Sequence, residues 1–216
     1  MSRWRKRRAL RRYERDRAWP LDDVTDGMGR INGQGREPIA RMPYGISRVG
    51  FSGCESIAVY NLLRDMGREV TLPEVIRAAD ENRCFTLFGL TGIFPRGVMR
   101  LLKVFGLRFA EVSREERQRL GEGDGLSGRR RYIAIVQRTI HLGKRSLPNP
   151  FGTIHTFLLV WDEEGTRIGG KPGTVHWTAY NRYNSSRRGR VYGDIGAVLD
   201  DRARYLQLLA IEDSGA

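Results

Sequence analysis

The sequence predicts an α+β fold, in which a helical half of the chain is followed by an antiparallel sheet. Apolar residues recur at helical spacing between residues 54 and 105, whereas from residue 107 onward short runs alternate or are continuously apolar, as in strands. Glycine and proline separate these segments, and no internal repeat is present. Helices first and strands afterwards are the pattern of an α+β domain.

The first helix is expected to begin around Cys54. Ser52 and Glu55 have the Ser-x-x-Glu spacing of a capping box, which makes Ser52 the expected N-cap. The segment up to Met66 is apolar nearly all round, as is typical of a buried helix, and Gly67 is the expected C-terminal glycine.

Thr71 and Glu74 have the same capping-box spacing and predict the start of a second helix. A third helix is expected from about Pro95 to Phe105, with Gly106 as its end. Strands are expected at residues 107–112, 132–136, 154–161, 174–180 and 205–211, with a short helix or turn at 194–199.

The chain is expected to consist of a basic tail and lead-in, residues 1–37, and one domain, residues 38–216. Residues 1–17 carry nine arginine and lysine side chains against two carboxylates, which is +7 of the formal net charge of +13. A segment so rich in like charge and so poor in apolar residues is usually solvated and disordered. Its charge would also suit weak binding to an anionic membrane surface or to nucleic acid.

Several protein classes are not expected. No run of 18 apolar residues is present, and no apolar segment follows the basic N-terminus, so neither a transmembrane helix nor a secretory signal is expected. Two cysteines give no disulfide framework, and the three histidines do not join them at metal-ligand spacing. We therefore expect a reduced, cytoplasmic setting and no metal or cofactor.

Cys54 is the candidate nucleophile. In the first turn of its helix, unpaired backbone N–H groups and the helix dipole favour an anion. Such a position lowers the pKa of a thiol and favours the thiolate, which is the reactive form. The alternative is a small buried thiol that closes a core helix, since cysteine is among the most often buried residues. Cys84 has no capping context and is expected to be structural.

His155 and Asn181 are the candidate base and its orienting group. His155 begins one expected strand, Asn181 follows the next, and a glycine-rich linker joins the two. Folding the strands about residue 168 sets His155 opposite Asn181, on the same face of the sheet. An asparagine there can hold the imidazole in the tautomer that accepts a thiol proton. The alternatives are a satisfied histidine at a strand end and a turn asparagine.

The chain contains the segments Gly-Cys-Glu-Ser-Ile-Ala-Val-Tyr-Asn-Leu-Leu, Leu-Pro-Glu-Val-Ile, Phe-Gly-Leu-Thr-Gly, Val-Met-Arg-Leu-Leu-Lys-Val-Phe-Gly-Leu, Ile-His-Thr-Phe-Leu-Leu-Val-Trp and Thr-Ala-Tyr-Asn-Arg-Tyr. Over about residues 45–211 they resemble bacterial papain-like cysteine peptidases, and in particular the double-glycine leader peptidases, which process bacteriocin precursors. The resemblance implies a papain-like fold with Cys54 as nucleophile, His155 as base and Asn181 as third member.

Three positions depart from the family pattern. Papain-like enzymes carry a glutamine six residues before the cysteine, whose amide completes the oxyanion hole; here that position is Arg48. The backbone N–H of the nucleophile remains a donor, and Ser47, Ser52 and Arg48 are candidates for the second. Leader peptidases also usually have glycine after the cysteine and aspartate as the third residue, where this chain has Glu55 and Asn181.

We therefore expect a cysteine peptidase that cleaves a peptide or leader-peptide substrate through a Cys54–His155–Asn181 triad. The alternative is a catalytically weak papain-like relative that binds peptides or membrane surfaces. A third class is a nucleic-acid-binding protein that acts through the basic tail. Against this class, the rest of the sequence has no motif of aromatic and basic residues for stacking on bases.

Overall fold

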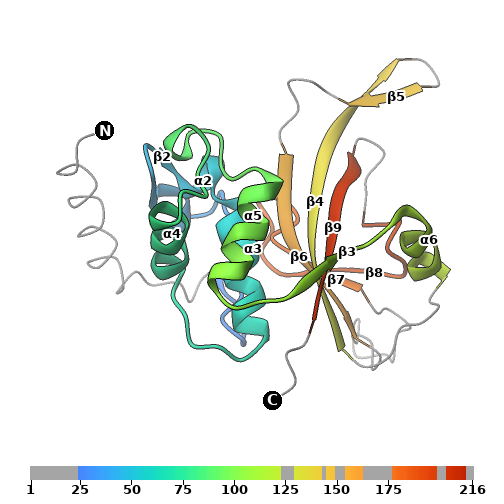
Figure 1. Ribbon diagram of the computed structural model, residues 1–216, viewed down its shortest axis with the longest axis horizontal. Helices are drawn as coiled ribbons and strands as arrows, with labels where there is room; N and C mark the ends of the chain where they lie inside the picture. The colour runs from blue at the N-terminus through green and yellow to red at the C-terminus, as the bar shows by residue number, and fades with distance from the viewer. Residues whose placement is uncertain are drawn as a thin grey trace. The chain divides into compact units, whose positions relative to one another are not determined.

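In the computed structural model the chain forms two compact units, which are described separately. The first comprises Met1–Leu107 and Tyr180–Arg188, and the second comprises Arg108–Ala179 and Gly189–Ala216. Helices dominate the first unit and an antiparallel sheet dominates the second, so the predicted α+β class is confirmed (Figure 1). The structure describes residues 24–122, 129–142, 145–148, 154–162, 177–198 and 203–212.

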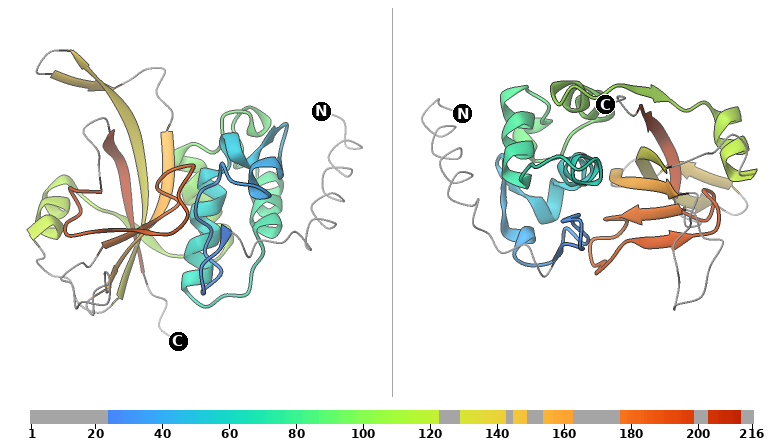
Figure 2. Two further views of the ribbon diagram at one scale, coloured as in Figure 1. Left: turned by 180° about the vertical axis from the view of Figure 1, so that it is seen from behind. Right: turned by 90° about the horizontal axis from the view of Figure 1, so that it is seen from below.

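Three helices that pack against one another form the centre of the first unit (Figures 1 and 2). Every residue of α3 except Arg64 is buried, which confirms the prediction of a central helix. The elements of this unit are η3 (Ile39–Arg41), β1 (Pro43–Tyr44), β2 (Ser47–Arg48), α2 (Val49–Ser52), α3 (Cys54–Asp65), α4 (Leu72–Glu81), η4 (Leu87–Gly89) and α5 (Pro95–Val104).

The start of α4 is fixed by the capping box predicted from the sequence. The Thr71 hydroxyl oxygen accepts the backbone N–H of Glu74 at 3.3 Å, and the Glu74 carboxylate accepts the backbone N–H of Thr71 at 2.8 Å. Helices α3 and α5 are followed by Gly67 and Gly106, whose φ angles of +73° and +71° are the left-handed values that favour glycine. The ends expected from these two glycines are confirmed.

The core of the first unit begins ahead of residue 38, where we expected the domain to start. Val24 and Ile31 are both fully enclosed. The side chain of Asn61, within α3, accepts the backbone N–H of Ile31 at 2.7 Å and donates to its carbonyl oxygen at 2.8 Å. These bonds join the lead-in to the central helix. Residues 1–23, which include the basic tail, lie outside the described residues.

The second unit holds a sheet with the strand order β3-β9-β4-β6-β7-β8, and β5 pairs with β4. The pairs β3–β9, β9–β4, β4–β6, β4–β5 and β7–β8 are antiparallel. The elements are β3 (Phe109–Glu111), α6 (Arg114–Glu122), β4 (Arg129–Leu142), β5 (Arg145–Pro148), β6 (Ile154–Asp162), β7 (Trp177–Tyr180), β8 (Arg190–Tyr192) and β9 (Ala203–Ile211).

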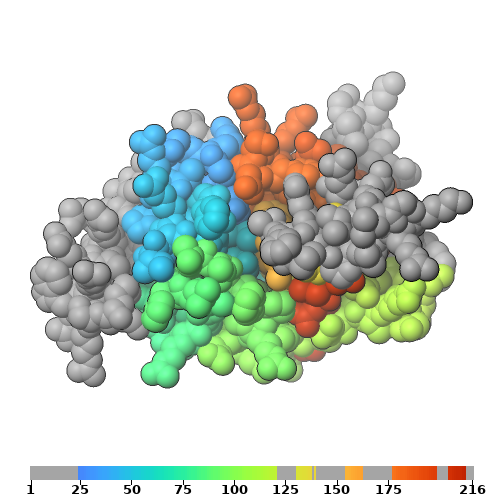
Figure 3. Space-filling view, turned by 90° about the horizontal axis from the view of Figure 1, so that it is seen from above, coloured from blue at the N-terminus to red at the C-terminus, as the bar shows by residue number. Residues whose placement is uncertain are grey.

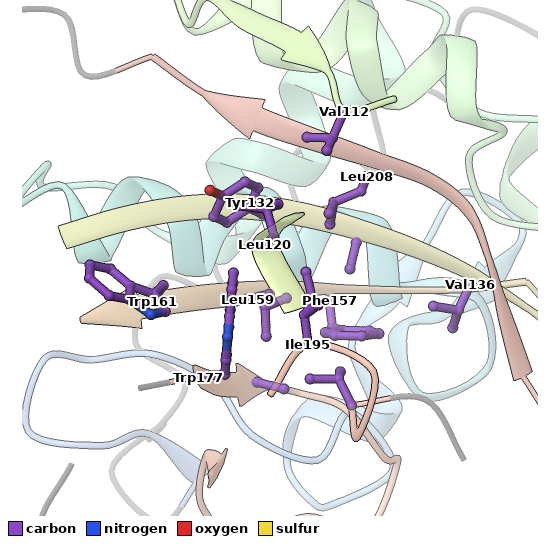
Figure 4. Packing of buried hydrophobic residues seen from close by; sticks show 13 residues of the cluster. Val112, Leu120, Tyr132, Val136, Phe157, Leu159, Trp161, Trp177, Ile195 and Leu208 are labelled. Atoms are coloured by element: carbon purple, nitrogen blue, oxygen red, sulfur yellow. The ribbon is translucent and has the colours of Figure 1, made fainter. Parts of the chain in front are cut away.

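Alternate residues of the central strands form the core of the second unit (Figure 4). Phe157 and Leu159 of β6 share one face of the sheet, because successive side chains of a strand point to opposite faces. Trp177 of β7 joins the same cluster and lies with its ring centroid 5.6 Å from that of Tyr132. The odd-numbered positions of β6 and β7 thus point to the same face.

Helix α6 was not expected from the sequence, which is nearly all polar there. It begins at a second capping box, in which Ser113 Oγ accepts the backbone N–H of Glu116 at 3.1 Å and the Glu116 carboxylate accepts that of Ser113 at 3.4 Å. Leu120 is the residue that α6 contributes to the core cluster. Among the described residues, no helix combines the length and apolarity needed to cross a membrane.

Candidate active site

Cys54 is the first residue of α3, and its side chain is buried. Helix α2 ends at Ser52, and Gly53 is both the C-cap of α2 and the N-cap of α3. A Cβ at Gly53 would lie 2.7 Å from a methyl group of Val49, so glycine is what allows one helix to follow the other directly. Cys54 therefore lies in the first turn, where backbone N–H groups have no partner within the helix.

The capping box predicted from Ser52 and Glu55 is wrong, because no side chain caps the start of α3. Ser52 is already the last residue of α2, whereas an N-cap residue needs non-helical dihedral angles. Its hydroxyl oxygen lies 2.9 Å from Ser47 Oγ and 3.2 Å from the Leu90 carbonyl oxygen. The start of α3 at residue 54 places Glu55 one position too early to serve as the capping glutamate.

Glu55 instead points into the interior of the first unit and is 3% exposed. Hydrogen bonds with its own backbone N–H, with the Cys54 thiol and with the backbone N–H of Ile93 lower the pKa of this carboxyl. Burial removes more hydration than these bonds replace, so the pKa of Glu55 is raised from 4.5 to about 7. Gly92 lies over the carboxylate, since a Cβ there would be 2.9 Å from both of its oxygens.

Replacing Glu55 with glutamine is expected to stabilise the protein progressively as the pH rises. Because the pKa is higher in the folded state, the stabilisation due to the bound proton is full below about pH 4.5 and is lost as the pH rises through about 7. Glutamine has no such loss, so the unfolding free energy of the variant relative to wild type should grow by about 3 kcal/mol between pH 4.5 and pH 8.

Urea unfolding of both proteins at several pH values measures this difference. Glu81→Gln, at an exposed position of α4, is the matched control and should show little change with pH. A Glu55→Gln difference that stays constant from pH 4.5 to pH 8 would contradict the raised pKa of Glu55.

Asn181 belongs to the first unit, where it is fully buried beside the lead-in. Its side-chain oxygen accepts the backbone N–H of Gln34 at 2.9 Å, and its amide nitrogen lies 3.2 Å from the Gln34 side-chain oxygen. Its own backbone N–H donates to Asn32 Oδ1 at 3.0 Å, and its φ of +60° shows that β7 has ended. The side-chain oxygen of Asn181 can accept a second hydrogen bond besides the one from Gln34. Because Asn181 and His155 belong to different units, the orientation of His155 by Asn181 stays a prediction.

His155 lies in the second unit, at the second residue of β6 and opposite Val136 of β4. Its side chain is half-buried, and its ring stacks near Phe157 with 6.0 Å between centroids. It therefore shares the face of the core cluster, as do the odd-numbered residues of β7. The adjacency of β6 and β7 is confirmed. Because Cys54 and His155 belong to different units, a contact between thiol and imidazole stays a prediction.

The burial of three polar residues near these candidates was not predicted from the sequence: Asn32, Gln34 and Glu55. The Gln34 side-chain amide donates to the carbonyl oxygen of Gly50 at 3.4 Å, four residues before the candidate nucleophile. For Asn32 and Gln34, the only sequence signal of a role was that two amide side chains occur in a glycine-rich lead-in. Hydrophobic periodicity does not show that such an irregular segment is buried.

The other candidate ligands and thiols do not form a site in the described part of the chain. The Cys84 thiol is buried and lies 3.8 Å from the carbonyl oxygen of Asn82, and burial raises the pKa of Cys84. His141 is paired with Ser146 between β4 and β5, and His176 lies outside the described residues. Over those described segments, no group of three or more histidine, cysteine or acidic side chains could hold a metal ion.

A scan of the sequence against protein-family models finds no match, and a search of curated proteins finds no similar chain. The class that the fold and site define is an α+β protein with a buried thiol and a buried carboxyl side by side at a helix N-terminus. Any more specific function has to be inferred from the chemistry of these residues.

Proposed function

We propose that the chain is a papain-like cysteine peptidase that cleaves a peptide or leader-peptide substrate, with Cys54 as its nucleophile. The observation that carries this proposal is the position of the Cys54 thiol in the first turn of the buried helix α3. A rigid central helix holds the sulfur in place, and its N-terminal N–H groups favour the negative charge of a thiolate and of an oxyanion beside it.

In the proposed reaction His155 is the general base and acid, and Asn181 orients it. The thiolate adds to the carbonyl carbon of the peptide bond, and collapse of the tetrahedral intermediate expels the amine and leaves a thioester on Cys54. Water then hydrolyses the thioester and restores the thiol. This mechanism requires the imidazole of the second unit to come within about 3–4 Å of the sulfur at some stage of turnover.

An exposed apolar surface close to Cys54 in sequence and in space supports a peptide as substrate. The chain before α3 is bonded to the loop before α5, since the backbone N–H of Ile46 donates to the Phe88 carbonyl oxygen at 3.0 Å. These two segments lie side by side in Figure 3, as blue-to-cyan and green atoms. The apolar surface comprises the exposed side chains of Ile46, Phe51, Leu87, Phe88, Leu90 and Phe94.

The backbone that presents this surface is strained. Leu87 and Phe88 have φ angles of +46° and +60°, which are uncommon for residues other than glycine. Both side chains are nevertheless about 60% exposed, at 62% and 60%, so the strain does not serve to bury them. Strained residues and contiguous apolar surfaces are both frequent where a protein binds a ligand.

The same apolar surface favours a second candidate, a catalytically weak relative that binds peptides or membrane surfaces. Binding of this kind needs the apolar surface but does not need the Cys54 thiol. Binding to peptides or vesicles that is unchanged by Cys54→Ser, with no cleavage by the wild-type protein, would favour this candidate.

The test of the proposed function is cleavage of a mixed peptide library by the full-length protein, followed by mass spectrometry. Cys54→Ser is expected to abolish cleavage, because a serine hydroxyl at this position is a far weaker nucleophile than a thiolate. Cys84→Ser is the matched control and should retain cleavage. Equal cleavage by the wild-type and Cys54→Ser proteins would contradict the proposal.

A further inference from the structure

We propose that Glu55 is the group that accepts the proton of the Cys54 thiol, so that the two side chains share one proton within the first unit. This inference deepens the proposed function and rests on it only in taking Cys54 as the nucleophile. It assigns to this chain a catalytic carboxyl that the Cys54–His155–Asn181 triad does not contain.

The geometry places the carboxyl directly beside the reacting atom. Cys54 and Glu55 are the first two residues of α3, both side chains are buried, and the Cys54 thiol is among the hydrogen-bonding groups that lower the pKa of the Glu55 carboxyl. The Glu55 Oε2 atom has no hydrogen-bond partner among the described residues. A buried carboxylate oxygen without a partner is costly unless it gains a proton or a donor. The Cys54 thiol is the side chain that acts as a donor to this carboxyl.

The enclosure of Glu55 explains why this carboxyl can hold a proton near neutral pH. Burial is the main cause of its raised pKa, and the other causes are two backbone N–H groups and the Cys54 thiol. Helices α2, α4 and α5, the lead-in at residues 29–31 and the loop that contains Gly92 pack against α3, and no charged side chain from them is among the causes of the shift. The thiol is thus the titratable group that faces Glu55.

The proposed step is a proton transfer with no change in the charge of the pair. The S–H bond of Cys54 breaks, its electron pair stays on sulfur, and an O–H bond forms on the Glu55 carboxylate. The thiolate is then adjacent to a neutral carboxyl that can donate a hydrogen bond to it, in place of a like charge that would oppose it. In the peptidase mechanism Glu55 thus takes the thiol proton in place of His155. His155 then enters as the imidazolium, protonates the departing amine and recovers a proton from the water that hydrolyses the thioester.

The test is the pH dependence of Cys54 alkylation by iodoacetamide, with the Cys54-containing peptide quantified by mass spectrometry. The measurement uses the His155→Ala protein, so that the imidazole does not contribute. A pair that shares one proton titrates in two separated steps. We expect the rate to rise through about pH 7, to change less than about twofold between pH 7.5 and pH 9, and to rise again at higher pH.

Adding Glu55→Gln should remove the plateau. A single thiol with a pKa near the usual value of about 8.5 should react several times faster at pH 9 than at pH 7.5. Glu81→Gln, the matched control, should leave both steps in place. A single step in the His155→Ala protein, unchanged by Glu55→Gln, would overturn the inference. Failure of the wild-type protein to cleave peptides would count against the proposed function and not against this profile.

Discussion

Replacing His155 with alanine is expected to abolish peptide cleavage, with kcat/KM falling by at least about a hundredfold. The imidazole has to return a proton to the leaving amine, and no other histidine is expected to reach the thiol. Asn181→Ala should weaken cleavage less, because asparagine orients the base and transfers no proton. The measurement is steady-state cleavage of a peptide identified from the library, for the wild-type protein and both variants.

His141→Ala is the matched control for this prediction. His141 lies on β4 in the part of that strand paired with β5, whereas His155 pairs with Val136 of the same strand. The control should retain full activity. If His155→Ala cleaved as fast as wild type, His155 would have no part in the chemistry and the triad would have to be abandoned.

Replacing Asp65 with alanine is expected to destabilise the first unit by about 3–5 kcal/mol. The Asp65 side chain is fully buried and forms an ion pair with Arg30, whose own side chain is 10% exposed. Arg30 also bonds Asp26 at 2.9 Å and lies 3.9 Å above the ring centroid of Tyr180. Removal of Asp65 leaves the buried guanidinium of Arg30 without the buried carboxylate that balances its charge. Chemical denaturation of the two proteins measures the effect.

The exposed pair between Glu37 and Arg41 is the matched control. Its atoms are 2.8 Å apart, but the two side chains are 54% and 74% exposed. Glu37→Ala should therefore change the unfolding free energy by about 0.5 kcal/mol or less. A similar small loss for Asp65→Ala would show that the enclosed ion pair does not hold the lead-in to α3.

Local signals in the sequence were sufficient where one interaction decides the structure. The capping box of Thr71 and the glycines at 67 and 106 predicted helix limits that the structure confirms. The capping box expected at Ser52 failed because the preceding four residues are themselves helical, and a spacing of residues does not reveal that. Helix α6 was missed because its capping signal at Ser113 was not recognised in a segment with so little apolar pattern.

The candidate site was predictable only in part. Cys54 could be singled out because the apolar run that follows it predicted a buried helix, although the capping box expected to start this helix does not form. The burial of Glu55 could not, since it depends on Gly92 and Ile93, which come nearly forty residues later in the chain. The hydrogen bonds between Gln34 and Asn181 join residues 147 positions apart, and no periodicity in the sequence indicates such a long-range contact.

Covalent labelling of the full-length wild-type protein by a peptidyl epoxide tests the central claim most directly. An epoxide reacts with an activated thiolate, and peptide mapping by mass spectrometry identifies the modified residue. We predict rapid labelling of Cys54, which lies in the first turn of α3, and none of Cys84, whose pKa is raised by burial. Slow and equal labelling of both cysteines, or labelling of Cys84 alone, would contradict the assignment of Cys54 as the nucleophile.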